Sequence, residues 1–148
     1  RSLYTYWKRG TPPPQMTILN APIRDACGSR RVRTNTPSQA LLLLNEGEYL
    51  KSARNLAQIV LTPKKANLAQ RIAFAFETVT SKLPDQKEQV MLSDLLKSLQ
   101  SSYNSQPSLA DALCEGVQVQ GAGQKAELAA WTILVNALYN LDITKTRE

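Results

Sequence analysis

Three arginines lie immediately before the first predicted helix of this 148-residue chain. Arg30, Arg31 and Arg33 precede the run 36–39, which has the Thr-Pro-Ser-Gln pattern of a helix-capping box with proline at the first helical position. Guanidinium groups bind carboxylate, sulfate and phosphate, and the free N–H groups of a helix start favour the same anions. The spacing predicts an anion-binding site or an interdomain contact. The alternative is that these arginines pair with acids of this chain or of a neighbouring domain.

The start of the chain interleaves aromatic rings with cations. Tyr4, Tyr6 and Trp7 are followed by Lys8 and Arg9. Aromatic rings stack on sugars or bases, while cations neutralise sulfate or phosphate. We therefore predict stacking by the three rings and anion binding or interdomain contact by the two cations. The alternative is that the rings anchor this segment to the rest of the domain, and without a nucleic-acid-binding motif nucleic acid is not the expected partner.

The positive charge is concentrated at one end of the chain. The net charge is +6, and residues 1–35 contain seven basic side chains and one acid, Asp25, so the remaining residues are balanced at 11 of each sign. Residues 1–7 have the pattern of a short strand, and Pro12–Pro14 predict an extended, polyproline-like path. We predict an extended basic arm over 1–35 and a helical bundle over 36–148. Both belong to a single domain, expected to be the C-terminal fragment of a larger protein.

Several classes of chemistry are excluded for this chain acting alone. It contains no histidine, and its two cysteines, Cys27 and Cys114, are far apart in the sequence. These facts exclude histidine-based triads, histidine-ligated zinc and a thiolate metal cage, so we expect no metal and no cofactor. The acids form no evident catalytic pair, and enzyme activity of the isolated chain is not expected. The cysteines are either two buried residues or one disulfide.

Six amphipathic or apolar segments predict the fold. The expected helices begin at Thr36 and then cover about 49–61, 66–80, 85–103, 108–116 and 125–140. Ser108 is the predicted cap of the fifth helix, and residues 118–124 are a predicted loop. No segment has the length of apolar sequence that a membrane span needs. The predicted class is all-α, a bundle of five or six helices with an extended basic N-terminal arm and a buried C-terminal helix.

The last predicted helix is apolar around most of its circumference. Its polar side chains between 128 and 141 are Thr132, Asn136 and Asn140, which the four-residue spacing places in one stripe. A helix of this kind belongs at the centre of a bundle, where buried amides need partners. Arginines of the arm or carbonyl groups at a helix end are the expected partners. The alternative is that this stripe is the exposed face of the helix.

Three stretches of the sequence resemble a known family. They are residues 1–9 with Pro12–Pro14, residues 30–45, and residues 127–131 together with 140–142 and 146–148. They resemble the planctomycete-specific domain of unknown function that ends large multidomain proteins carrying cytochrome-c-like modules. The resemblance implies an exported bacterial protein, sometimes with carbohydrate-binding modules, and it implies no catalytic residues. Asn20 departs from the expected pattern, which has an aspartate before Ala21-Pro22.

The charge pattern and the resemblance lead to three functional hypotheses. The first is a non-catalytic interaction or structural module of a larger protein that is periplasmic or at the cell surface, with the basic arm docked on an upstream domain of the same polypeptide. The second is a surface that binds an anionic, sulfated polysaccharide. The third is an active site shared with an upstream module, in which Arg30 or Arg31 stabilises a developing oxyanion.

Overall fold

The structure is a computed structural model that describes Tyr6, Lys8 and residues 10–22, 34–62, 66–117 and 121–145. Within this part of the chain there are eight α-helices and no named strand, which confirms the predicted all-α class. In chain order the helices are α1 (Pro14–Ile18), α2 (Pro37–Asn45), α3 (Gly47–Leu61), α4 (Leu68–Thr80), α5 (Gln86–Ser105), α6 (Pro107–Leu113), α7 (Ala122–Tyr139) and α8 (Asp142–Lys145).

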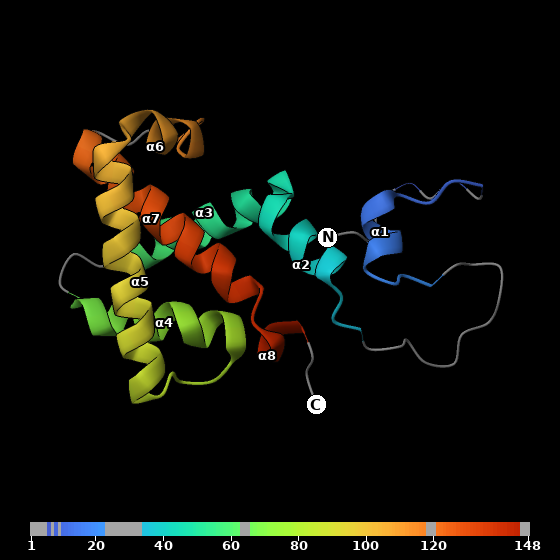
Figure 1. Ribbon diagram of the computed structural model, residues 1–148, viewed down its shortest axis with the longest axis horizontal. Helices are drawn as coiled ribbons and strands as arrows, with labels where there is room; N and C mark the ends of the chain where they lie inside the picture. The colour runs from blue at the N-terminus through green and yellow to red at the C-terminus, as the bar shows by residue number, and fades with distance from the viewer. Residues whose placement is uncertain are drawn as a thin grey trace.

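Helix α7 forms the centre of the bundle. It contacts α2, α3, α4, α5, α6 and α8, and Figure 1 shows it passing between α3 and α5. Trp131, Leu134 and Val135 are fully buried, as are the alanines at 129 and 130. A helix that is apolar nearly all round gains most free energy when every side is covered, so the other helices pack around it.

Side-chain caps set the starts of three helices. Thr36, Asn67 and Asp85 each form a capping box with the residue three positions later, at the starts of α2, α4 and α5. The Thr36 box was predicted from the sequence, and the predicted break after Asn45 is also confirmed, since α2 ends there and α3 begins at Gly47. These caps satisfy backbone donors that a helix leaves unpaired.

Two predicted boundaries near the end of the chain are wrong. Helix α6 begins at Pro107 with Gln106 at the N-cap position, so Ser108 lies inside the helix, because proline suits the first helical position. Helix α7 begins at Ala122, three residues before the expected start. Gly121, with φ of +100°, ends the preceding loop, and Gly123 lies in the first turn, whose N–H groups have no partner within the helix.

The arm is also less extended than expected. Pro14 starts the short helix α1, because a proline at the end of a polyproline run is equally suited to begin a helix. Among the helices α1 contacts only α2, and Figure 1 shows it beyond α2, away from α4, α5 and α6. Helix α8, immediately after the central helix, was not predicted. The strand predicted over residues 1–7 lies outside the described residues except for Tyr6.

None of the helices in the described ranges combines the length and the apolar composition required to cross a membrane.

Truncation of the central helix tests this packing. Leu134 is 0% exposed, and Leu134→Ala should lower the free energy of unfolding by about 3 kcal/mol, through lost burial and the cavity it leaves. Urea denaturation followed by circular dichroism measures the change. The control is Met91→Ala on α5, where the side chain is 72% exposed and the expected change is below about 0.5 kcal/mol. Equal losses in the two variants would contradict the central position of α7.

Candidate functional site

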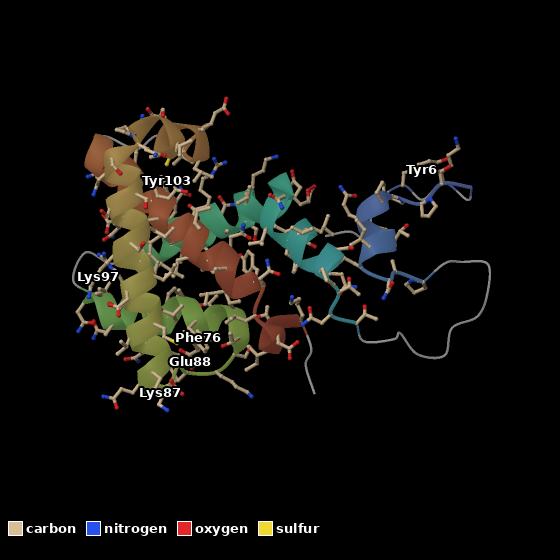
Figure 2. The ribbon with its side chains drawn as sticks, in the orientation of Figure 1. Tyr6, Phe76, Lys87, Glu88, Lys97 and Tyr103 are labelled. Atoms are coloured by element: carbon tan, nitrogen blue, oxygen red, sulfur yellow. The ribbon has the colours of Figure 1, made fainter. Side chains whose placement is uncertain are left out.

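The structure describes two of the predicted arm residues. Tyr6 is 83% exposed, and Figure 2 shows it on the opposite side of the molecule from Lys97 and Tyr103 of α5. Lys8 is exposed, and its carbonyl accepts a hydrogen bond from the Thr11 N–H at 3.2 Å. The other residues predicted to bind an anion or to stack lie outside the described ranges; they are Tyr4, Trp7, Arg9, Arg30, Arg31 and Arg33. Their roles stay predictions.

The two asparagines of the polar stripe on α7 bond to helix α2. Thr132 and Asn136 are 1% and 2% exposed, and Asn140 is partly buried. The Thr132 hydroxyl donates to the carbonyl of Leu128 in its own helix at 2.8 Å. Asn136 Nδ2 donates to the Leu44 carbonyl at 3.1 Å, and Asn140 Nδ2 donates to the Ala40 carbonyl at 3.2 Å. The two amides therefore match two carbonyls with the same four-residue spacing on an antiparallel helix.

The end of α2 explains why a carbonyl is available there. The last four carbonyls of an α-helix have no partner in the helix, and Leu44 lies one residue before the end of α2. Asn136 supplies the missing donor from another helix. Its own Oδ1 atom is buried and has no hydrogen-bond partner in the described part of the chain.

A buried glutamine joins α1 to the start of α2. Gln39 Nε2 donates to the Ile18 carbonyl at 3.0 Å and to Thr34 Oγ1 at 2.7 Å. Its Oε1 accepts from the Thr36 N–H at 3.2 Å, which completes the capping box. Asn20, which adopts φ of +51°, donates to the same Thr34 hydroxyl at 2.6 Å. One amide thus both caps α2 and holds the end of α1 against it.

Helix α8 brings an acid to the same end of α2. Asn35 Nδ2 donates to Asp142 Oδ1 at 2.7 Å. Lys145 Nζ donates to Asn35 Oδ1 at 2.9 Å and to Asn140 Oδ1 at 3.4 Å. A carboxylate of this chain therefore lies beside the helix start where the sequence predicted an anion. The arginines predicted to bind an anion lie outside the described residues, so both interpretations of them stay predictions.

A cavity of about 370 Å³ opens between α3, α6 and α7. Its lining combines one face of α3, the C-terminal end of α6 and one side chain of α7; the residues are Gly47, Leu50, Lys51, Arg54, Ala112, Leu113, Glu115, Gly116 and Thr132. Arg54 Nη1 donates to the carbonyls of Leu113 and Glu115, at 3.0 and 2.6 Å. Arg54 therefore caps α6, as cationic side chains do at helix C-termini.

Arg54 was not among the site residues predicted from the sequence. Its neighbours Ala53 and Asn55 give no sign of a special role, and its carbonyl partners come from about 60 residues further along the chain. The signal in the sequence that could have identified Arg54 as a site residue was its spacing from Gly47 and Leu50. Gly47, Leu50 and Arg54 are three and then four residues apart, which places them on one face of the helix.

Cys114 is a buried free thiol beside this cavity, and Cys27 lies outside the described residues. Burial raises the pKa of the Cys114 thiol, although the Arg54 and Lys125 charges act in the opposite direction. A raised pKa disfavours the thiolate, which is the reactive form. In the described ranges no three residues among His, Cys, Asp and Glu are placed to hold a metal ion.

Comparison with known proteins gives one match. A family model described as "PSD1: Protein of unknown function (DUF1553)" matches residues 1–96, which run from the arm through α4 and into α5. No curated protein and no solved structure matches the chain.

Replacing Gln39 tests its role in holding α1. Gln39→Glu keeps the Oε1 acceptor for Thr36 but removes the Nε2 donor to Ile18 and Thr34. Amides that bond within 13–21, such as those of Leu19 and Ala21, should then exchange about tenfold faster, because α1 opens locally from α2. Hydrogen exchange read by mass spectrometry measures this.

The matched control is Ser38→Ala, an exposed neighbour in the first turn of α2. It should leave exchange in α1 unchanged. Unchanged exchange in Gln39→Glu would show that other contacts hold α1 in place.

Proposed function

The chain belongs to the PSD1 (DUF1553) family of proteins of unknown function, and we propose that it is an interaction module of a larger protein. In this proposal the module is non-catalytic. Its basic arm and the helices α1 and α2 dock on another domain of the same polypeptide.

The incomplete covering of α1 and α2 carries this proposal. None of the described residues before Thr34 is buried, and α1 contacts no helix other than α2. On α2 itself, Leu41 and Leu44 are 61% and 43% exposed. They are three residues apart, so they form an apolar strip on one face. Apolar side chains gathered on a projecting element are typical of a surface that another protein covers.

The chemistry of the attachment supports the same proposal. Helix α2 buries only Gln39 and Leu43. It is joined to α7 through the amides of Asn136 and Asn140. Polar attachment and little burial suit an element that completes its packing against a partner. The excess of basic residues in 1–35 supports an acidic or polar partner surface.

The finer parts of the proposal depend on the sequence resemblance. An exported bacterial parent protein, periplasmic or at the cell surface, with cytochrome-c-like modules upstream is what the resemblance implies. We include this setting in the proposal because it identifies the partner domain to test.

Hydrogen exchange of α1 and α2, measured in a shorter and a longer protein, tests the docking. Amides of α1 and α2 are compared in this 148-residue chain and in the longer polypeptide that the proposal requires. Docking predicts about tenfold or greater slowing in the longer polypeptide, because a covered helix opens less often. Helix α5 provides the internal control and should exchange equally in both proteins. Equal exchange of α1 and α2 in both proteins would argue against docking.

A second candidate is binding of an anionic, sulfated polysaccharide. The observation that favours it is the exposure of Tyr6 and Lys8, one ring and one cation of the predicted stacking and anion-binding segment. Both side chains are accessible to a ligand. The six further cations among 1–33 that the sequence places around them add to the positive charge.

Titration with dextran sulfate and with neutral dextran tests this candidate. Binding to dextran sulfate alone should weaken steeply as salt is raised, because counterion release drives the association. The combined variant Lys8→Ala, Arg30→Ala, Arg31→Ala, Arg33→Ala should abolish it. Lys87→Ala and Lys97→Ala together, on exposed positions of α5, are the control and should bind normally. Binding that is independent of salt would count against the candidate.

A further inference from the structure

We propose that the cavity between α3, α6 and α7 binds a small amphipathic carboxylate, with Arg54 as its anchor. This site is separate from the arm and from the exposed strip on α2. The proposal depends on the position of Arg54, on the charge and polarity of the lining, and on open space at two glycines.

The first step is the fixed position of the Arg54 guanidinium. Its Nη1 atom is held by two carbonyls at the end of α6, at 3.0 Å from Leu113 and 2.6 Å from Glu115. Its Nε atom is buried and has no hydrogen-bond partner in the described part of the chain. A guanidinium group whose orientation is already set loses little entropy when it binds a ligand. The Nη2 group has no hydrogen bond in the described part of the chain, and it is the donor that remains for a charge-assisted bond to a carboxylate.

The second step is the balance of charge around the cavity. Lys51, Arg54 and Glu115 are the ionisable residues of the lining, so together they leave one positive charge. Lys51 also pairs with Glu48 at 2.7 Å, and the hydrogen bond and charge of Lys51 lower the pKa of that carboxyl. With Glu48 counted, the two cations and two acids cancel, so the site has no excess positive charge; this suits a monoanion bound by Arg54 and disfavours a polyphosphate.

The third step is the apolar part of the lining. Leu50 comes from α3, and Ala112 and Leu113 come from α6, on either side of Arg54. Small-molecule sites typically combine apolar walls with a few polar groups that fix orientation, in volumes of roughly 300–1,000 Å³. The cavity, at about 370 Å³, is large enough for a short alkyl chain that ends in a carboxylate.

The fourth step is open space beside the backbone. Gly47 and Gly116 both line the cavity, and a Cβ atom added at either position would meet no atom within 4 Å. Gly47 is also the first residue of α3, whose start has no side-chain cap. An uncapped helix start favours negative charge in its neighbourhood. A ligand can therefore approach the backbone here, and a larger side chain at position 47 would take up that space.

Octanoate and its neutral isostere octanamide are the probes for the test. Isothermal titration below the micelle-forming concentration should show one saturable site for octanoate. Octanamide should bind about tenfold more weakly or worse, because it forms no charge-assisted bond with Arg54. Equal binding of the two probes, or no binding of octanoate, would overturn the proposal.

Two variants locate the site. Gly47→Leu leaves Arg54 and its carbonyl partners intact and fills the cavity, so it should weaken octanoate binding by about tenfold or more. Arg54→Lys keeps the charge but loses the planar donors, and it should also weaken binding. Lys97→Gln, on the outer face of α5 in Figure 2, is the control and should bind octanoate normally.

The Gly47→Leu result decides the outcome even if Arg54→Lys destabilises α6. Binding to Gly47→Leu as tight as in the unmodified chain would overturn the proposal. In that case the role of Arg54 is limited to capping α6.

Discussion

Burial of α7 is the constraint on which the rest of the structure depends. Its side chains are apolar on most sides, so no single neighbour can cover it, and six other helices contact it. This requirement determines where polar groups can lie. Among the described residues of α7 the buried polar side chains are Thr132 and Asn136, and both donate hydrogen bonds to carbonyl groups, while the Asn136 Oδ1 atom has no partner in the described part of the chain. A buried polar group without such a partner would cost about 1–3 kcal/mol.

The described helices form two groups that are held in the molecule by different kinds of interaction. Helices α3 to α7 are held mainly by a common apolar core. Helices α1, α2 and α8 are joined to that core through amides, a hydroxyl and a lysine, centred on Gln39 and Asn35. The first kind of attachment is strong and non-directional, whereas the second is specific in direction and involves little apolar area.

Much of the architecture was predictable because local signals agree with the fold. The capping box at Thr36, the break at Asn45–Gly47 and the apolar circumference of the last long helix identify most of the bundle. Helix α1 was not predictable, because a run of prolines suits both an extended path and a helix start. Gln106 and Ser108 show the same limit at α6, where the proline between them decides the boundary.

The candidate sites were less predictable than the fold, since their partners come from distant parts of the sequence. Arg54 acquires its role from carbonyls of α6, and Asn35 acquires its role from α8. Neither pairing leaves a pattern in the local sequence. The stripe on α7 was visible because its own residues repeat every fourth position. Carbonyl groups at a helix end were among its expected partners, but the sequence did not identify α2 as the helix that supplies them.

The matched spacing between α2 and α7 has a consequence for how the two helices separate and rejoin. Ala40 and Leu44 on one helix meet Asn140 and Asn136 on the other, four residues apart on both. A shift of α2 by one residue would rotate its carbonyls away by about 100°, so both bonds would be lost together. Helix α2 can therefore detach at a small cost in apolar burial, yet it returns to a single alignment. Such an attachment can open and close reversibly, and it restores the same alignment of α2 on α7 each time.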